Sequence, residues 1–305
     1  MNNKRDLPKH LRVTGHECNQ GGHKMKEIYK QYYFQREEKY PNLAPPTLPW
    51  TKPAVESLKW DGYAVMRGAA DIEMVSRLKE EFDRMIRENE NLGKASEYFI
   101  QVKNPLLVCK PAMDLALSPI VREVSTEYYE AQPSIGTLNL RRSLQNNLTD
   151  HNFLKYGNLF FHYDNNSPWF LKFFFYLNDV DQSGGPFVFV QGSHLDKNDR
   201  IPHWRHSKRY SDKKIEQTFG ADRIKYLTAK AGDVIVANTR GIHKGLKVEG
   251  KDRNMLTVNL LIHPEISNQR WDLLDTDFGR FAMNKEWFNE LPENVKPFAD
   301  FLIKQ

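Results

Sequence analysis

Short apolar runs separated by turn residues dominate the second half of the chain. From about residue 134, β-branched and aromatic residues recur in brief stretches, and Gly, Asn, Asp and Ser lie between them. This pattern is typical of the strands of a β-sandwich or barrel. The runs are "SIGTLNLRR", "NLFFHYD", "WFLKFFFYL", "PFVFVQG", "IKYLTA", "GDVIVAN" and "RNMLTVNLLIH".

The first half has the periodicity of helices. In "ADIEMVSRLKEEFDRMIRENEN" the apolar residues recur at helical spacing and form one face, which predicts an amphipathic helix. A second helix is predicted at "PIVREVSTEYYEA", with Pro119 in its first turn. "SLKWDGYAVMRG" predicts a short strand with a turn at Asp61-Gly62. The apolar face of the first helix consists of Ile72, Val75, Leu78, Phe82 and Ile86.

The two ends of the chain differ from its centre. Residues 1–50 finish in "NLAPPTLPW", and its prolines predict an extended N-terminal arm rather than a helix. Residues 265–305 predict helical structure at "NKEWFNELPENVKPFADFLIK", packed on the outside. We therefore expect a single domain over residues 1–305, with helices and a strand in 51–133 and the β-rich core in 134–264.

A long polar segment interrupts the β pattern at residues 195–223. It is rich in Lys and Arg, and a loop of this length in a compact domain is often a lid or binding loop. The alternative is a solvated insertion that contains its own short helix.

The composition is that of a globular protein, with 40% hydrophobic and 27% charged residues. The longest apolar runs, "FFFYL" and "VNLLI", are far shorter than the roughly 20 residues of a membrane helix. The start, "MNNKRDLPKHLRV", has no apolar signal core, so we expect a cytoplasmic protein. The two cysteines, Cys18 and Cys109, argue against a disulfide framework or a cysteine zinc site.

The charge balance is mildly basic, with a net charge of +5 and a pI near 8.9. This favours an anionic small molecule as partner, and it also allows contact with an anionic membrane surface. It falls short of the charge of a nucleic-acid-binding protein, and we find no motif of that class.

The segment "FFHYDNNSPWF" brings a histidine and a carboxylate in among large apolar residues. His162 and Asp164 are two residues apart, so on a strand both side chains point to the same side. A second pair, His194 and Asp196, opens a polar loop, whereas ligands on a strand are better preorganised. We therefore favour the first pair as metal ligands; a structural His–Asp hydrogen bond is the alternative.

A third candidate ligand, His243, follows the predicted strand "GDVIVAN". Two histidines and one carboxylate form a facial triad, which leaves coordination positions open on iron. Arg253 comes ten residues later, at the start of a buried strand, where a guanidinium needs an anion. Its fork suits a carboxylate, and a surface ion pair is the alternative.

His162-Tyr163-Asp164, His243 and Arg253, in this order, resemble the iron(II)/2-oxoglutarate dioxygenases of the phytanoyl-CoA dioxygenase family. "LKWDGYAVMRGAADIEMVSRLKEEFD", "FYLNDVDQSGGPFVFVQGSH" and "AGDVIVANTRGIH" resemble further landmarks of that family, and the likeness covers residues 57–262. The resemblance implies a β-rich α+β fold, with a double-stranded β-helix (jelly-roll, cupin-like) core and flanking helices.

The resemblance also implies the chemistry. His162, Asp164 and His243 would hold Fe(II), Arg253 would bind the far carboxylate of 2-oxoglutarate, and dioxygen would be the oxidant. The products would be succinate, CO2 and a substrate hydroxylated at an unactivated C–H bond. Related halogenases have Gly or Ala at the position of Asp164, so this carboxylate favours hydroxylation or desaturation. Gly245 departs from the small hydroxyl residue common there, so another group must assist Arg253, or it acts alone.

Three other residues are candidates for the pocket. Lys172 lies in "WFLKFFFYL", where an ammonium is costly without an anion, so it is expected to support 2-oxoglutarate or a substrate acid. Snorkelling at a sheet edge is the alternative. Arg141 and Arg142 alternate in direction, so one of them can face the pocket; we assign Arg142 and Trp169 to the substrate, with core packing as the alternative for Trp169.

The expected substrate is a small anionic metabolite or sugar, for example the 3-deoxy-octulosonic acid of lipopolysaccharide. An acyl thioester, an amino acid or another secondary metabolite would also fit. Two other functions are compatible with the pattern: a non-catalytic cupin-like binding module, and a zinc or manganese hydrolase or isomerase on the same fold. No feature of the sequence indicates an oligomeric state.

Overall fold

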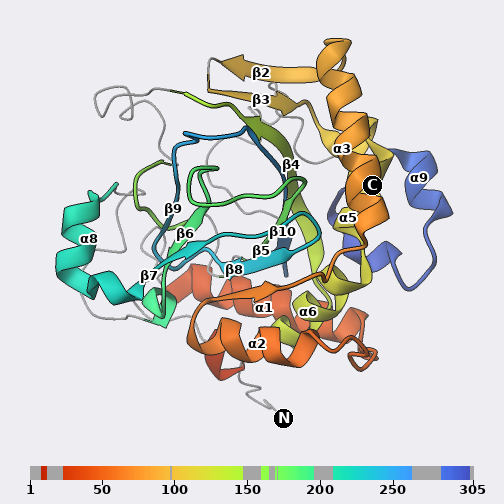
Figure 1. Ribbon diagram of the computed structural model, residues 1–305. Coiled ribbons are helices and arrows are strands. Elements are labelled where there is room, and N and C mark those ends of the chain that lie inside the picture. Colours follow the sequence, from red (N-terminus) through yellow and green to blue (C-terminus); the bar gives the residue numbers. More distant parts are fainter. Residues whose placement is uncertain are drawn as a thin grey trace.

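Two antiparallel sheets form the core of the molecule (Figure 1). The computed structural model describes residues 8–11, 23–96, 98–146, 159–164, 169, 171–195, 209–262 and 283–302. The larger sheet has the order β1-β8-β5-β10-β4-β3-β2, and the smaller has the order β7-β6-β9. With helices packed outside them, the sheets form the predicted jelly-roll fold.

Most strands are short, as the sequence pattern predicted, and β4 and β10 are the two long ones. In the larger sheet they are β1 (Tyr63–Met66), β8 (Val234–Asn238), β5 (Leu171–Tyr176), β10 (Arg253–Leu261), β4 (Ser134–Ser143), β3 (Phe99–Val102) and β2 (Leu92–Ser96). In the smaller sheet they are β7 (Ile224–Leu227), β6 (Phe187–Val190) and β9 (His243–Gly245).

The two faces of the larger sheet have different partners, because successive side chains of a strand point to opposite sides. One face, with Leu140, Phe173 and Leu256, belongs to the main hydrophobic core. The other face points into the barrel, where Phe174 of β5 stacks on Phe187 of β6 with ring centroids 4.4 Å apart. We call this second face the inner face.

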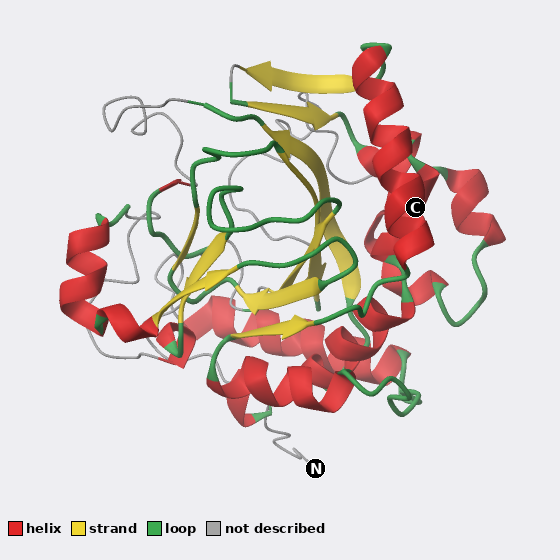
Figure 2. Cartoon of the chain, viewed as in Figure 1, coloured by secondary structure: helices red, strands yellow, loops and turns green. Residues whose placement is uncertain are grey.

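Helices pack outside the two sheets, with α8 beside the smaller one (Figure 2). They are α1 (His23–Lys39), α2 (Thr51–Trp60), α3 (Ile72–Arg87), α4 (Pro105–Val108), α5 (Lys110–Ala116), α6 (Pro119–Tyr129), α8 (Asp212–Phe219) and α9 (Lys285–Glu290). The 3-10 turns are η1 (Lys9–Leu11), η3 (Ser193–Leu195), η4 (Ala221–Arg223) and η6 (Lys296–Leu302). Among these described helices, none is long and apolar enough to cross a membrane.

The predicted helices and most predicted strands are confirmed. Asp71 caps α3 by accepting the backbone N–H groups of Glu73 and Met74, and Pro119 opens α6. Six of the seven predicted runs become strands. The seventh, "NLFFHYD", forms isolated bridges from Phe161 to Tyr210 and from His162 to His243.

The N-terminal prediction is wrong in part. The arm contains a helix, α1, and the described residues 40–50 that follow it, where the prolines lie, form no helix or strand. "SLKW" ends α2 instead of starting a strand, because Val55 and Leu58 give this segment a buried helical face. The turn at Gly62 is confirmed by its φ of +87°, and a Cβ there would lie 2.5 Å from the Nδ1 atom of His194.

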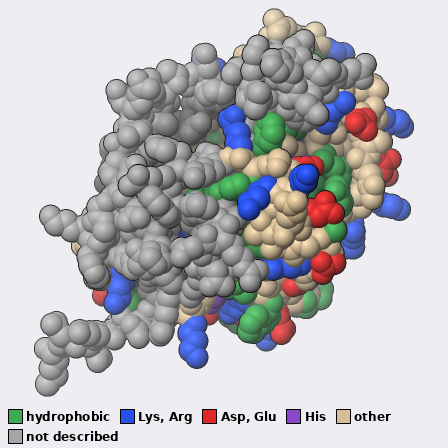
Figure 3. All heavy atoms as spheres, turned by 90° about the vertical axis from the view of Figure 1, so that its left-hand side faces the viewer, with side chains coloured by type: hydrophobic (Ala, Val, Ile, Leu, Met, Phe, Trp, Pro, Cys, Tyr) green, Lys and Arg blue, Asp and Glu red, His purple; other side chains and the backbone are tan. Residues whose placement is uncertain are grey.

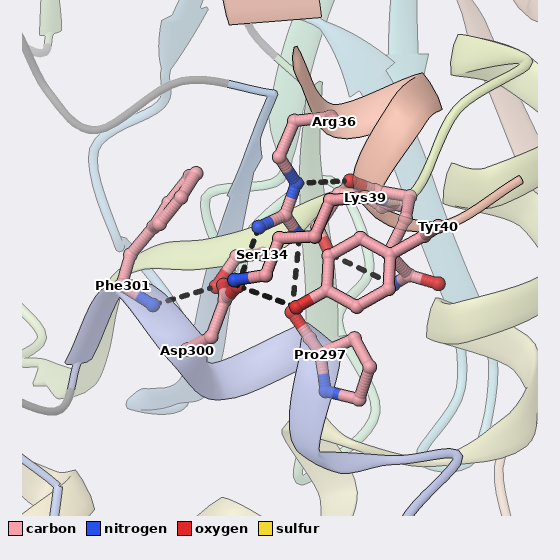
Figure 4. A network of polar contacts seen from close by, with 9 residues as sticks. Arg36, Lys39, Tyr40, Ser134, Pro297, Asp300 and Phe301 are labelled. Atoms are coloured by element: carbon pink, nitrogen blue, oxygen red, sulfur yellow. Dashed lines mark hydrogen bonds and ion pairs between the residues drawn. The ribbon is translucent and has the colours of Figure 1, made fainter.

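Charged side chains join α1 to the C-terminal turn η6 (Figure 4). The guanidinium of Arg36 donates from Nη1 to Asp300 at 2.6 Å, from Nε to the carbonyl of Gln132 at 2.8 Å, and from Nη2 to that of Pro297 at 3.1 Å. Tyr40 donates to the same carboxylate at 2.9 Å. The tail is helical at α9 and η6, as predicted, and η6 buries Phe298, Ala299 and Leu302.

The polar insertion packs against the core where it is described. Residues 196–208 lie outside the described residues. Beyond them, α8 buries Ile215 and Phe219 in a small cluster with Phe161 and Tyr163. The insertion therefore has its own short helix, and this helix packs against Phe161 and Tyr163, the two neighbours of His162. Figure 3 shows the face on this side, and its described part carries both basic and acidic side chains.

Candidate metal centre

Backbone pairing brings the two histidines of the predicted triad together. His162 and His243 exchange two hydrogen bonds, with N–O distances of 2.9 and 2.8 Å. Residues paired in this way point their side chains to the same side, and the two imidazole centroids are 4.4 Å apart. Asp164 follows two residues later, and its backbone N–H donates to the carbonyl of Thr239, just beyond β8, at 2.8 Å. The three side chains therefore converge on one point.

The three possible ligand atoms form a compact group. They lie within 4.8 Å of one another, and Nε2 of His243 is 3.8 Å from Oδ2 of Asp164. The competing His194 lies in η3, where its ring nitrogen is 3.3 Å from the carbonyl of Lys59, and it is not part of this group. Asp196 lies outside the described residues. The structure thus assembles the pair that the sequence analysis favoured.

Backbone carbonyls fix the tautomer of both histidines. The Nδ1 atoms of His162 and His243 lie 2.8 Å from the carbonyls of Phe160 and Gly241, respectively. A carbonyl can only accept a hydrogen bond, so each Nδ1 carries the proton and each Nε2 keeps a free lone pair. Metal-binding histidines are commonly oriented in this way by an outer acceptor.

The electrostatics favour neutral imidazoles beside an ionised carboxylate. Burial, together with the neighbouring His162, lowers the pKa of His243 to about 3, and burial also lowers the pKa of His162. Burial acting alone would raise the pKa of Asp164, but Lys172, His243 and His162 lower it overall. Two neutral imidazoles and a carboxylate are the donor set of a facial triad, so these residues fit a divalent metal ion.

Lys172 contacts the carboxylate of the triad. It lies on β5, between β8 and β10, and its Nζ atom is 2.6 Å from Oδ2 of Asp164. β5 is an interior strand, so the alternative of snorkelling at a sheet edge is wrong. The anion that Lys172 meets in this structure is Asp164.

Arg253 is buried without a carboxylate partner among the described residues. Its side chain lies at the start of β10, and the residue is 8% exposed. Nη2 donates to the hydroxyl of Ser143 at 3.1 Å, and Nε has no hydrogen-bond partner. Burial lowers the pKa of Arg253. A buried guanidinium with unused donors is prepared for an anion.

Ser143 supplies a hydroxyl group beside Arg253, where Gly245 cannot. Ser143 and Arg253 are opposite each other in the pairing of β4 with β10. The sequence pattern gives no sign of Ser143, because its contact with Arg253 depends on the register of two strands far apart in the chain. Gly245 is opposite Phe187 in the smaller sheet.

The structure contradicts the assignment of Arg142 and Trp169 to the substrate. Arg142 points to the helical side, where it bonds to Asp83 of α3 and to Asn254. Trp169 is 3% exposed in the main core, and its indole N–H donates to the carbonyl of Leu11 at 2.9 Å. Because successive side chains of β4 point to opposite faces, the neighbouring Arg141 lies on the inner face, opposite Met255.

A jelly roll that holds two neutral histidines, a carboxylate and a buried arginine defines the class of non-haem metal-dependent oxygenases. The sequence model of the phytanoyl-CoA dioxygenase (PhyH) family matches residues 109–255. This segment, just under half of the chain, therefore resembles the PhyH family, and the match supports an enzyme of the 2-oxoglutarate-dependent oxygenase type. Fe(II), 2-oxoglutarate and dioxygen are the cofactors of this class.

Solved structures share the fold. The non-heme alpha ketoglutarate dependent epimerase SnoN from nogalamycin biosynthesis is 17% identical, with a TM-score of 0.53 over 70% of this chain and 82% of SnoN. HygX from Streptomyces hygroscopicus, solved with nickel, 2-oxoglutarate and hygromycin B, is 15% identical, with a TM-score of 0.51 over 71% of this chain and 88% of HygX.

AviO1 from Streptomyces viridochromogenes Tue57 is 17% identical, with a TM-score of 0.52 over 72% of this chain and 96% of AviO1. Among curated proteins, none matches the chain significantly.

Proposed function

We propose that the protein hydroxylates an unactivated C–H bond of a small anionic metabolite or sugar. In this proposal Nε2 of His162, Nε2 of His243 and the carboxylate of Asp164 hold Fe(II). Arg253 and Ser143 bind the far carboxylate of 2-oxoglutarate. The observation that carries the proposal is the convergence of this triad in the same barrel as a buried arginine that has no carboxylate partner among the described residues.

The bound iron would supply the oxidation that consumes dioxygen and 2-oxoglutarate and releases succinate and CO2. The chain positions the reactants and excludes water. Lys172 holds the carboxylate of Asp164 in place through its contact at 2.6 Å. Phe174 and Phe187 form an apolar wall close to the ligands, since the ring of Phe187 lies 5.4 Å from that of His243.

Several observations support hydroxylation of a polar small molecule. A carboxylate is present at Asp164, where the related halogenases have Gly or Ala. The net charge of +5 favours an anionic substrate. SnoN was solved with nogalamycin RO and HygX with hygromycin B, so this fold accommodates small molecules in relatives. The 3-deoxy-octulosonic acid of lipopolysaccharide is one candidate.

A metabolite library tests the proposal. The purified protein is incubated with Fe(II), 2-oxoglutarate and dioxygen, and each compound is scored by the succinate formed above the substrate-free rate. We expect acidic sugars and other small acids to stimulate succinate formation in the wild type and not in the Asp164→Ala variant. If no compound does so, and no succinate forms without substrate, the proposed function is wrong.

A further inference from the structure

The inner face of the larger sheet carries a second arginine, which the proposed mechanism does not use. Arg141 lies on β4, opposite Met255 of β10 on one side and Gln101 of β3 on the other. Its guanidinium carbon is 4.4 Å from the ring centroid of Phe99. Burial, and then the nearby charge of Arg253, lower the pKa of Arg141 to about 10. Arg253 is two residues from Met255 on the same face of β10, so the two guanidinium groups lie near each other.

The contacts of Arg141 leave one edge of its guanidinium available. Nε and Nη2 both donate to the side-chain oxygen of Gln101, at 3.0 and 2.6 Å. A guanidinium has five N–H hydrogens, so three of them have no partner among the described residues. The free edge includes Nη1 and the outer hydrogen of Nη2, and this fork matches the two oxygens of a carboxylate.

The surroundings of Arg141 are polar and partly accessible. Along β4, Thr137, Asn139 and Arg141 are half-buried, whereas Leu138 and Leu140 between them are buried. Thr257 of β10 is opposite Asn139 and is also half-buried. Alternate residues of a strand are about 6.6 Å apart, close to the width of a sugar ring. This part of the inner face therefore offers hydroxyl and amide groups next to a cation.

We infer that Arg141 binds the carboxylate of a polyhydroxylated acid, the prime substrate, while Arg253 binds the cosubstrate. This inference rests on the proposed function and narrows its substrate class to sugar acids. Gln101 is a positioning residue, because it fixes the guanidinium in one orientation. The ring of Phe99 packs against the guanidinium of Arg141 in a cation–π contact.

Nuclear magnetic resonance of arginine side chains tests the inference without turnover. The full chain is labelled with 15N-arginine and loaded with Zn(II) in place of Fe(II), and the Nε–H signals are assigned with the Arg141→Gln and Arg253→Gln variants. We expect 2-oxoglutarate to shift the signal of Arg253. Glucuronate, added next, should shift the signal of Arg141, and neutral glucose should not.

Binding measured by calorimetry on the same zinc complex gives the size of the effect. Arg141→Gln should weaken the binding of glucuronate by about tenfold or more, since a hydrogen bond to a charged group contributes about 1.5–3 kcal/mol. It should change the affinity for 2-oxoglutarate by less than about twofold. The matched control is Arg142→Gln, one residue along on the opposite face, which should leave both affinities unchanged.

Three results would overturn the inference. In the first, 2-oxoglutarate alone saturates the signals of both arginines, which would assign Arg141 to the cosubstrate. In the second, glucuronate leaves the signal of Arg141 unmoved. In the third, glucose 6-phosphate shifts it and glucuronate does not, which would assign a phosphate. Failure of the proposed function would look different, because 2-oxoglutarate would then leave Arg253 unshifted.

Discussion

Two buried arginines of this molecule have opposite surroundings. Arg36, between α1 and η6, meets a carboxylate and two carbonyls, and its guanidinium carbon lies 4.7 Å from the ring centroids of Tyr40 and Phe301 (Figure 4). Arg253, inside the barrel, meets one hydroxyl, and its Nε has no partner. Both residues are at least nine-tenths buried.

This difference indicates that Arg36 stabilises the fold, whereas Arg253 is available to bind a ligand. The contacts of Arg36 compensate for the cost of burying a cation, so this residue stabilises the packing of α1 against η6. The contacts of Arg253 do not, and its burial costs stability unless an anion binds. The missing counter-charge of Arg253 therefore indicates a binding site for an anion. Variants of both regions test whether the two arginines differ in this way.

The largest effect is expected at the triad itself. Asp164→Ala removes one of three ligands and leaves Lys172 without its carboxylate. Loss of an outer hydrogen-bond partner alone costs about 10–100-fold in metal affinity, so loss of a ligand should cost more than about 100-fold. Calorimetric titration with Co(II) measures this. An unchanged affinity would remove Asp164 from the site.

Asp300→Asn should remove the ion pair of Arg36 and lower the stability of the protein. It leaves Arg36 buried without a counter-charge, and breaking a buried pair lowers the free energy of unfolding by about 3 kcal/mol. Urea denaturation measures the loss. The affinity of the folded variant for 2-oxoglutarate should stay at the wild-type value, and a large change there would erase the distinction between the two regions.

Arg253→Gln should weaken the binding of 2-oxoglutarate without lowering the stability of the protein. Losing the charged contact should weaken 2-oxoglutarate binding by about 10–100-fold, because such hydrogen bonds contribute about 1.5–3 kcal/mol. Without cosubstrate, the variant should unfold at the same or a higher urea concentration, since an unpaired buried charge is gone. A loss of stability in Arg253→Gln as large as that in Asp300→Asn would show that Arg253 is a structural residue.

The smallest effect concerns pH and metal binding. Two ordinary histidines with a pKa of about 6.5 would lose about 100-fold in metal affinity between about pH 7.5 and 5.5, as protons compete for the ligands. The folded pKa of His243 is about 3, so this ligand stays unprotonated at pH 5.5, and burial lowers the pKa of His162 below its ordinary value. Calorimetry with Co(II) should therefore show a loss of less than about tenfold over this range.

The same lowered pKa values predict the stability of the metal-free protein. Between pH 6.5 and about 4, the unfolded chain binds protons that buried His243 and His194 do not, since the folded pKa of His194 is about 4. The unfolded state thus binds more protons, so stability must fall as pH drops through this window. Urea denaturation of the metal-free protein at successive pH values measures the slope, and an increase in stability on acidification would contradict it.

The sequence predicted the identity of the ligands better than their surroundings. The short strands predicted a β-sandwich or barrel, and the His-x-Asp spacing with the later His243 predicted the triad. The jelly roll was implied by the resemblance to the phytanoyl-CoA dioxygenase family. Arg141 in place of Arg142, Ser143 beside Arg253, and the pairing of Lys172 with Asp164 depend on strand register, which residue spacing does not set. The helix α1 was missed because its sequence has no apolar stripe at helical spacing.

If this barrel binds a metal ion and 2-oxoglutarate together, the two ligands should give a joint spectroscopic signal. Fe(II) and 2-oxoglutarate are added anaerobically to the purified protein, and visible absorption is recorded. We expect a weak charge-transfer band in the wild type, lost in Asp164→Ala and requiring about 10–100-fold more 2-oxoglutarate in Arg253→Gln. A folded wild-type protein that gives no band at saturating concentrations of both would contradict this joint binding.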